Sequence, residues 1–375
     1  MASVRKRSWK TDTGEIKTAW LVDYADSLGG RQRRHFPTKK AADAFRINIE
    51  GQIQTGVYRP DASKLTTKEV CESFLTHCLG RHQRDERMTR KMLVVYRGHI
   101  NNHILHPEYG IAAWKLSQLT ARAIGEFRDR IRTAGVTVPT TRKIIATLHS
   151  VLSHAISQDW IATNAAHRVK VIGSRSEGSK KIVPPSKEDM RIIIDAADES
   201  LRLMLIFAAS TGARAGEQWA ARWRDVNFDK GQLRISRRVD AYGDEGAPKS
   251  AAGVRTVPVS AQLLSALKAW KLKSKFSKPD DLIFSNGSGG HIGHDNLIKR
   301  QFLPLFKEAK RFNWHGLRHF AVSTWIEAGL APKTVQTFAG HASLQVTMDR
   351  YGHLFPSDDH HRAMDEIAKE LFRNV

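Results

Sequence analysis

Residues 314–355 read WHGLRHFAVSTWIEAGLAPKTVQTFAGHASLQVTMDRYGHLF. This stretch contains four side chains that can bind, protonate or attack a phosphate: His315, Arg318, His341 and Tyr351. His315 and Arg318 are three residues apart and share one helical face, where they can grip two oxygens of one phosphate. Tyr351 can attack phosphorus, but a free tyrosine has a pKa of about 10 and needs cationic neighbours or a base to ionise at neutral pH.

The net charge of the 375-residue chain is +22. Lys and Arg outnumber Asp and Glu by 12 to 6 in residues 1–60, by 19 to 10 in 61–180 and by 29 to 22 in 181–375, so the excess is not confined to one tail. Such a distribution favours a polyanion that several domains wrap, because each neutralised phosphate releases counterions. Solubility alone is the competing explanation. The length indicates two or three domains.

The cysteine content and the hydropathy pattern exclude several protein classes. Cys71 and Cys78 are the two cysteines, so neither a disulfide framework nor a CxxC metal or redox site is predicted. The basic N-terminus MASVRKRSWK lacks a following apolar signal segment, and the apolar run at 203–209 is too short to span a bilayer. We therefore expect a cytoplasmic protein with no membrane partner.

Residues 1–60 have the pattern of a small sheet with a helix. The predicted elements are strands at 19–24 and 31–36, an earlier strand before a turn at 12–14, and a helix from Thr38 to about Ile53. Arg31, Arg33 and Arg34 place cationic side chains on both faces of the strand at 31–36. A sheet with such side chains can enter a DNA major groove. Alternatively, the arginines only coat an exposed edge strand.

The pattern of residues 61–172 predicts an all-helical domain. The predicted helices are one opened by a capping box at Thr66–Glu69, then about Asp85–Leu105, Thr120–Thr133 and Thr140–Gln158. Their apolar residues recur at helical spacing, which predicts a shared core. Arg90, Lys91, Arg142 and Lys143 fall on polar faces and can meet a DNA backbone or only water; the sequence leaves both readings open.

Residues 173–182 include the polar run GSRSEGSKK, which predicts a linker. The following residues, 183–375, mix helices with a short sheet. The predicted elements are helices opening at Ser186, spanning 201–209 and starting at 214–219, strands at 232–239 and 254–259, and helices at about 260–273 and 294–310. The expected fold class is therefore a multidomain, mainly α protein with small β-sheets, ending in a mixed α/β domain.

Two further basic residues are placed where they can act on a phosphate. Arg214 follows a helix-breaking Thr-Gly pair, and its planar guanidinium can donate two parallel hydrogen bonds to a phosphate. A structural ion pair with Glu217 explains Arg214 equally well. Lys249 lies in the connection between two predicted strands and can protonate a leaving oxygen, although a lysine in a hairpin is most often simply solvated.

His315 and His319 form an HxxxH pair, which raises a metal site as a rival interpretation. The zinc-protease pattern needs Glu after the first histidine, and this chain has Gly316 there. We therefore predict no metal.

Six residues of this chain resemble, in type and order, the catalytic residues of the tyrosine recombinases, also called the phage integrase family. They are Arg214, Lys249, His315, Arg318, His341 and Tyr351. TGARAGE resembles the family's first arginine box, HGLRHFAVSTWIEAG its H-x-x-R box, FAGHASLQVTMDRYGHL its His-then-Tyr box, and PKSAAGVRTVPV its lysine hairpin. The resemblance covers residues 183–355, expected to be the catalytic domain. Residues 61–172 look like the family's core-site-binding domain, and residues 1–60 look like its arm-binding domain.

The resemblance implies a reaction that needs no cofactor. Tyr351 would attack the scissile phosphate, forming a 3′-phosphotyrosine bond and freeing a 5′-hydroxyl. Arg214 and Arg318 would hold the non-bridging oxygens, and the two histidines of the set would assist. Lys249 would protonate the leaving oxygen, and Glu217 would support the site.

The resemblance also implies partners. These are double-stranded DNA with core-type and arm-type attachment sites, a homotetramer that acts through a Holliday junction, a host DNA-bending protein and an excisionase. The segment through 362–372 would dock on a neighbouring subunit. The expected setting is the nucleoid of a bacterial cytoplasm, where a phage or another mobile element is integrated and excised. Two alternatives are a phosphotyrosine-forming resolvase or topoisomerase without partner exchange, and a DNA-binding relative with an inactive site.

Overall fold

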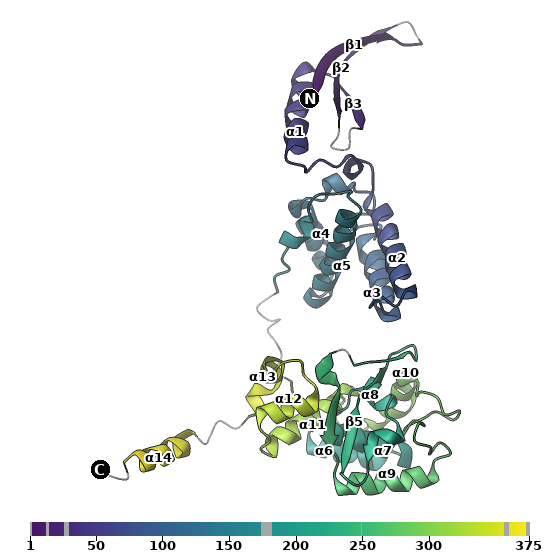
Figure 1. The fold of residues 1–375 in the computed structure, drawn as a ribbon, viewed down its shortest axis with the longest axis vertical. Helices are drawn as coiled ribbons and strands as arrows, with labels where there is room; N and C mark the ends of the chain where they lie inside the picture. Colours follow the sequence, from purple (N-terminus) through teal and green to yellow (C-terminus); the bar gives the residue numbers. More distant parts are fainter. Residues whose placement is uncertain are drawn as a thin grey trace. The chain divides into compact units, whose positions relative to one another are not determined.

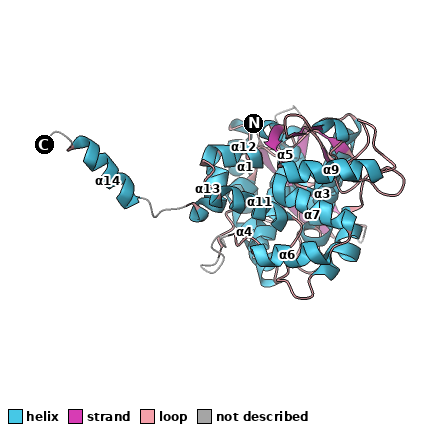
Figure 2. Cartoon of the chain, turned by 90° about the horizontal axis from the view of Figure 1, so that it is seen from below, coloured by secondary structure: helices cyan, strands magenta, loops and turns pink. Residues whose placement is uncertain are grey.

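A computed structural model of the chain describes residues 2–12, 15–25, 30–173, 182–248, 250–355 and 360–372. The chain forms two compact units, Met1–Gly178 and Ser179–Val375. Helices predominate, and the strands form small antiparallel sheets (Figures 1 and 2). The expected mainly α class with small sheets is confirmed. No helix in the described ranges is long and apolar enough to cross a membrane.

The chain begins with a three-stranded antiparallel sheet that one helix covers (Figure 1). Its elements are β1 (Ser3–Lys10), β2 (Ile16–Ala25), β3 (Arg31–Phe36) and α1 (Lys39–Gln54). Val22 and Tyr24 of β2 pack with Ala42 and Ile49 of α1 in a core of their own. Thr38 caps α1 as expected, since its side chain accepts from the Ala41 N–H. Residues 13 and 14 of the predicted turn lie outside the described residues.

Residues 67–157 form a helical bundle around a second core. Its helices are α2 (Thr67–Gln83), α3 (Arg90–His99), α4 (Ala121–Thr133) and α5 (Val138–Ser157). The predicted Thr66–Glu69 capping box is present, with the Thr66 N–H 2.7 Å from a Glu69 oxygen. Cys71 and Cys78 are buried free thiols in this core. Burial raises the pKa of Cys71 to about 12, which suits a packing residue and not a reactive one.

Two predicted helix starts in this bundle are wrong. The helix expected from Asp85 begins at Arg90, because Asp85 and Arg87 have φ values of 56° and 54° that no right-handed helix contains. Thr89 caps the helix instead. The helix expected from Thr140 begins two residues earlier, at Val138, because proline is well tolerated in a first turn, where its missing N–H is not needed.

The second unit opens with helices that pack on a small sheet. The helices are α6 (Lys187–Ala196), α7 (Glu199–Thr211), α8 (Ala215–Trp219) and α9 (Ala261–Lys273). The sheet order is β4 (Val226–Asn227), β5 (Gln232–Ile235) and β8 (Arg255–Pro258), and a separate ribbon pairs β6 (Arg238–Val239) with β7 (Glu245–Gly246).

Two predicted elements of this unit need correction. The strand expected at 232–239 is divided into β5 and β6, and Arg237 between them pairs with Asp225. The helix expected at 294–310 starts as α10 (His294–Leu297), widens into a π-helical turn at Ile298–Phe302 and ends in a 3-10 turn at Leu303–Leu305. Pro304 lacks the N–H that would continue the helix, which accounts for the early end.

The quoted stretch 314–355 folds into three helices. They are α11 (His315–Glu327), α12 (Pro332–Ala339) and α13 (Leu344–Tyr351), and a further helix, α14 (His360–Leu371), follows them in the chain. Leu317 of α11 is part of the core that α7 helps to form, which fixes the helix bearing the two histidines and Arg318. Val322, Val335 and Tyr351 pack in a neighbouring cluster that joins α11, α12 and α13.

Candidate active site

Arg214 stands where α7 ends and α8 begins. Gly212 ends α7 with a φ of 61°, and a Cβ at this position would lie 2.7 Å from the Trp325 ring, so the tight turn needs glycine. Arg214 then caps α8: its backbone N–H donates to Glu217 Oε2 at 3.0 Å. The Arg214 side chain remains 39% exposed, which leaves part of its guanidinium open to a ligand.

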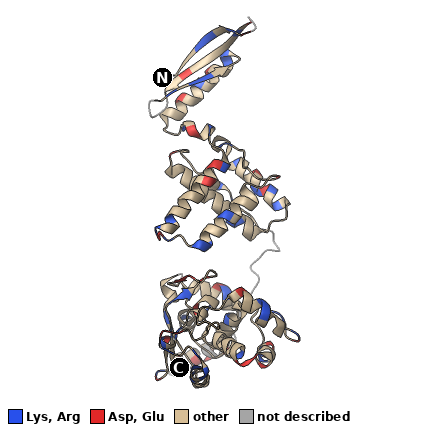
Figure 3. Cartoon of the chain, turned by 90° about the vertical axis from the view of Figure 1, so that its right-hand side faces the viewer, with Lys and Arg blue, Asp and Glu red and all other residues tan. Residues whose placement is uncertain are grey.

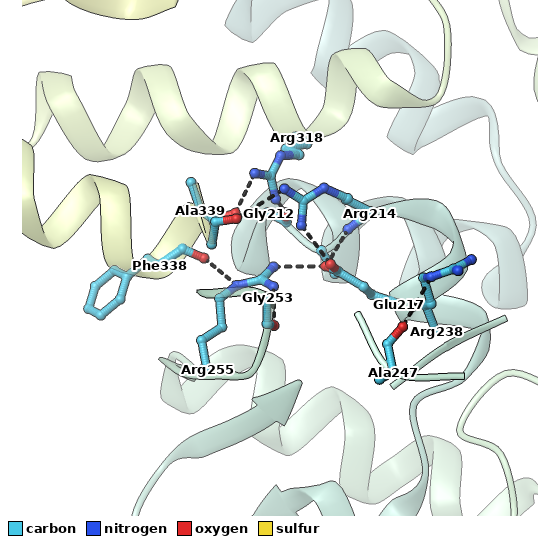
Figure 4. A network of polar contacts seen from close by, with 12 residues as sticks. Gly212, Arg214, Glu217, Arg238, Ala247, Gly253, Arg255, Arg318, Phe338 and Ala339 are labelled. Atoms are coloured by element: carbon cyan, nitrogen blue, oxygen red, sulfur yellow. Dashed lines mark hydrogen bonds and ion pairs between the residues drawn. The ribbon is translucent and has the colours of Figure 1, made fainter. Parts of the chain in front are cut away.

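Glu217 is a buried carboxylate that binds two arginines. Arg214 Nη1 donates to its Oε1 at 2.7 Å, and Arg255 Nη2 donates to its Oε2 at 2.8 Å (Figure 4). Burial acts to raise the pKa of Glu217, but Arg255 and Arg214 outweigh it and hold the pKa below its usual value. Glu217 is therefore ionised and orients both guanidinium groups.

Arg318 approaches the same place from α11 (Figure 4). It is 2% exposed, its Nη1 donates to Gly212 O at 2.8 Å, and its Nη2 donates to Ala339 O. Burial, together with Arg214 and Arg255, lowers its pKa to about 9, so the guanidinium still carries its charge at neutral pH. Carbonyls at the C-terminal ends of α7 and α12 thus fix a buried cation beside Arg214.

His341 enters the site at the end of α12. Gly340 before it has a φ of 61°, and a Cβ there would lie 2.9 Å from Ala252 O, so the approach again needs glycine. His341 Nδ1 lies 2.9 Å from Thr347 Oγ1, and Arg214 Nη2 donates to Gly340 O at 3.1 Å. A Thr347 hydroxyl that donates to Nδ1 leaves Nε2 to carry the ring proton and to donate to a phosphate.

Tyr351 ends α13 with its hydroxyl inside the protein. The residue is 1% exposed, and its ring stacks at 16° to the His341 ring with centroids 6.1 Å apart. Its Oη lies 2.6 Å from Nδ1 of His319. Burial raises the pKa of Tyr351, although Arg318, Arg350 and Arg214 act in the opposite direction. The phenol is therefore protonated at neutral pH.

The two histidines of the HxxxH pair lie on one face of α11. The rings of His315 and His319 meet edge to face with centroids 4.7 Å apart. Desolvation and nearby arginines lower the pKa of both to about 4, and His319 also opposes the protonation of His315. Within the described part of the chain, no group of three His, Cys, Asp or Glu side chains is placed to hold a metal ion.

The predicted site residues therefore meet from separate segments, with one exception. Direct contacts, or contacts through the backbone of Gly212, Ala339 and Gly340, join five of them: Arg214, Glu217, Arg318, His341 and Tyr351. His315 is connected to this group through His319. Lys249 lies outside the described residues. The ribbon β6–β7 leads to it from one side, and β8 begins six residues beyond it.

Of the predicted DNA-binding residues in the first unit, Arg31 and Arg33 share a face of the sheet. Arg31 donates to both oxygens of Asp23, at 2.8 and 2.7 Å, and Arg33 Nε lies 3.4 Å from the same carboxylate. Arg34 faces the other way, with its guanidinium 5.2 Å from the Phe45 ring of α1. The prediction that these arginines occupy both faces of the strand is confirmed.

The remaining four residues of that set lie on the helical bundle. Arg90 and Lys91 open α3 and are exposed, as are Arg142 and Lys143 near the start of α5. Arg142 Nε donates to Val171 O at 3.2 Å. Lys and Arg residues are found in every part of the chain (Figure 3). A DNA-binding role for these side chains stays a prediction.

Three residues that contribute to the site have no signal for this role in the sequence. Arg255 looks like an ordinary strand residue, and only the fold places it under Glu217. The spacing of His319 from His315 indicates only a metal ligand, and its partner Tyr351 lies 32 residues further along the chain. Thr347 gave no signal apart from its position on the same helix as Tyr351.

Comparison with known proteins supports the same interpretation. Residues 186–358 match the phage integrase family. A "Tyrosine recombinase XerC-like" protein of Caldanaerobacter subterraneus subsp. tengcongensis is 26% identical over an alignment of 364 positions that covers 88% of this chain and 90% of that protein. The "ICEBs1 integrase" of Bacillus subtilis is 24% identical over 355 residues, covering 88% of this chain and 91% of its own.

Solved structures share the fold. The Tn1549 transposon integrase in complex with a circular intermediate DNA matches with a TM-score of 0.62 at 17% identity, over 80% of this chain and 99% of that one. A lambda integrase tetramer bound to a Holliday junction matches with a TM-score of 0.58 at 17% identity, over 93% and 94% of the two chains. The region similar to the phage integrase family, residues 186–358, contains Arg214, Glu217, Arg318, His341 and Tyr351.

Proposed function

We propose that this chain is an integrase that cuts and rejoins DNA at specific sites through a 3′-phosphotyrosine bond to Tyr351. The observation that carries the proposal is the convergence of Arg214, Arg318 and His341 with a buried tyrosine, inside the region that matches the family. Cations fixed before the reaction stabilise charge on a transferred phosphoryl group without having to reorganise.

In this reaction the scissile phosphate lies between Arg214 and Arg318, which donate to its non-bridging oxygens. His315 and the Nε2 of His341 assist, and Glu217 keeps Arg214 in place. Lys249 protonates the leaving 5′-oxygen. The phosphotyrosine bond conserves the energy of the broken phosphodiester, so a 5′-hydroxyl of the partner strand can reseal it, and two rounds pass through a Holliday junction.

The first unit supplies DNA contacts. Residues 1–60 form an arm-binding domain that places the sheet face with Arg31 and Arg33 in a major groove, and residues 61–172 form a domain that binds core-type sites. Residues 173–182 link them to the catalytic domain, 183–375. An arm-binding domain implies a host DNA-bending protein and an excisionase as partners. The reaction integrates and excises a phage or another mobile element in the nucleoid of a bacterial cytoplasm.

The active form is a homotetramer on two duplexes. Apolar side chains of the terminal segment, Met364, Ile367, Leu371 and Phe372, are exposed in the single chain. Burying such a surface on a neighbouring subunit would stabilise the assembly. Deleting the residues after Ser357 should therefore spare DNA binding and weaken tetramers. Gel filtration of DNA complexes measures both, and a truncated chain that assembles normally refutes this role.

A suicide-substrate assay tests the proposed reaction. A nicked duplex with the core site of the element is incubated with the wild type or with Tyr351→Phe in EDTA, and adducts are separated on a denaturing gel. We expect a protein–DNA adduct from the wild type alone. If the wild type binds a verified site without ever cleaving it, the chain is a DNA-binding relative with an inactive site.

A further inference from the structure

The hydroxyl of Tyr351 has a specific neighbour whose role the phosphate-binding set does not explain. Its Oη lies 2.6 Å from Nδ1 of His319, a short hydrogen bond between a protonated phenol and an imidazole. His319 sits in α11 directly after Arg318 and one turn after His315. The residue that contacts the attacking oxygen is thus attached to the helix that also presents the phosphate-binding groups.

A buried phenol needs such a neighbour. Burial holds the pKa of Tyr351 above its usual value, so the nucleophile cannot be ionised in advance and must lose its proton during attack. His341 is not the acceptor, because its ring lies parallel to the tyrosine ring and its Nδ1 is bonded to Thr347. His315 contacts the ring of His319 and not the Tyr351 hydroxyl.

We propose that His319 is a catalytic residue that accepts the proton of Tyr351 Oη as this oxygen attacks the scissile phosphate. The inference rests on the proposed function. In the step, the bond between Oη and phosphorus forms and the bond from phosphorus to the 5′-oxygen breaks. The phenol proton passes to His319 Nδ1, and Lys249 gives a proton to the 5′-oxygen. Resealing reverses both transfers, so no other reactant is needed.

The electrostatics around His319 suit this exchange. Desolvation, Arg318 and Arg350 lower its pKa, so the ring is neutral before DNA binds and Nδ1 can accept. The groups that face it are Arg318 and His315 on its own helix and Arg350 and Tyr351 on α13. A phosphodiester held by Arg214 and Arg318 offsets their positive charge, which raises the proton affinity of the imidazole when the proton must move.

The test compares His319→Asn and His319→Ala with the wild type, all as full-length protein. The Asn amide oxygen reaches the position of Nδ1 and can accept the hydrogen bond, but it cannot take the proton. Single-turnover cleavage of the nicked substrate at pH 7 should slow by about 100-fold or more in both variants. His353→Asn is the matched control, since His353 is exposed and donates to Ile182 O; it should cleave at the wild-type rate.

Two further measurements separate proton transfer from positioning. Cleavage by His319→Asn should rise about tenfold per pH unit above pH 7, because ionised tyrosine becomes more abundant, while the wild-type rate levels off. A substrate with sulfur in place of the 5′-bridging oxygen has a leaving group that needs no acid. This substrate should restore the cleavage rate of Lys249→Ala, whereas cleavage by His319→Asn should stay slow.

The proposal is overturned if His319→Asn cleaves the normal substrate at the wild-type rate. It is also overturned if the sulfur substrate restores the cleavage rate of His319→Asn fully. Thermal unfolding and DNA binding of each variant verify that the fold is retained. Loss of cleavage in His319→Ala with full activity in His319→Asn assigns a positioning role and rejects proton transfer. Absence of an adduct with the wild type on a verified site is a different result, because it rejects the proposed function itself.

Discussion

Two carboxylates in this chain, Glu217 and Asp23, pair with two and three arginines, and the two clusters differ in their exposure to water. Glu217 is 3% exposed, and its partner Arg255 is 1% exposed. Asp23 is 6% exposed, but the side chain of its partner Arg31 is 65% exposed. Arg255 also donates to Phe338 O and Gly253 O, so several bonds hold its guanidinium in one place.

This difference in burial suggests different uses for the same kind of ion pair. A buried guanidinium with backbone partners cannot turn away, so the cluster around Glu217 presents a fixed charge to a reacting phosphate. Exposed guanidinium groups on flexible side chains can exchange a carboxylate for a base edge or a DNA phosphate at little cost. We infer that the Glu217 cluster is built for chemistry and the Asp23 cluster for adaptable binding.

The largest expected effect follows from removing the charge of Glu217. Glu217→Gln keeps the shape of the side chain but leaves Arg255 buried without a counter-charge. The free energy of unfolding of the second unit should fall by about 3–5 kcal/mol, as for other buried ion pairs that lose one partner. Urea denaturation measures the change. Asp23→Asn makes the same chemical change in the exposed cluster, and an equal loss there would contradict the comparison.

The next effect is a pH dependence that arises at His341. Burial, with help from Arg318 and Arg214, lowers its pKa to about 3, whereas an unfolded histidine titrates near pH 6.5. Below pH 6.5 this histidine is therefore protonated in the unfolded chain and neutral in the folded chain. The free energy of unfolding consequently falls as the pH drops toward 3. The lowered pKa values of Glu217 and Asp23 matter only below about pH 4.5.

The measurement is the melting temperature at pH 7 and pH 5. The second unit should melt at a lower temperature at pH 5, and His341→Asn should reduce that difference because it removes one suppressed proton site. A variant with the same difference as the wild type would show that other histidines carry the effect.

The sequence predicted those parts of the molecule that local chemistry determines. Capping side chains at Thr38, Thr66 and Ser186 located helix starts to within a residue, because an N-cap needs only its own first turn. The order of the two arginines, two histidines and the tyrosine predicted residues that the structure brings together, and their roles in catalysis stay a prediction. Glycines at 212 and 340 allow the turns that present Arg214 and His341.

Predictions from the sequence were incomplete or wrong where contacts join residues far apart in the chain, or where the backbone dihedral angles leave their usual regions. Arg255 reaches Glu217 across 38 residues, and His319 reaches Tyr351 across 32, so neither pair has a local pattern. The start of α3 was misplaced because Asp85 and Arg87 adopt positive φ, which non-glycine residues rarely do.

A smaller effect is expected in DNA binding by the exposed cluster. Asp23→Asn frees the arginines around it from their carboxylate, so binding to an unrelated duplex should tighten. The slope of log affinity against log salt should steepen by about one, for one more phosphate contact. Discrimination in favour of the arm-type site should fall, because the carboxylate no longer fixes the guanidinium positions. Fluorescence anisotropy at several salt concentrations measures all three, and an unchanged slope would contradict the adaptable role.

The smallest effect separates the two faces of the sheet. Strand alternation places Arg31 and Arg33 on the face with Asp23, whereas Arg34 lies over Phe45 on the side of α1. Arg34→Gln should lower stability by about 0.5–1 kcal/mol through the lost cation–π contact and leave arm-site affinity unchanged. Arg31→Gln should weaken binding to the arm-type site and leave stability unchanged. If Arg34→Gln weakens DNA binding as much as Arg31→Gln, the sheet does not bind DNA through its uncovered face.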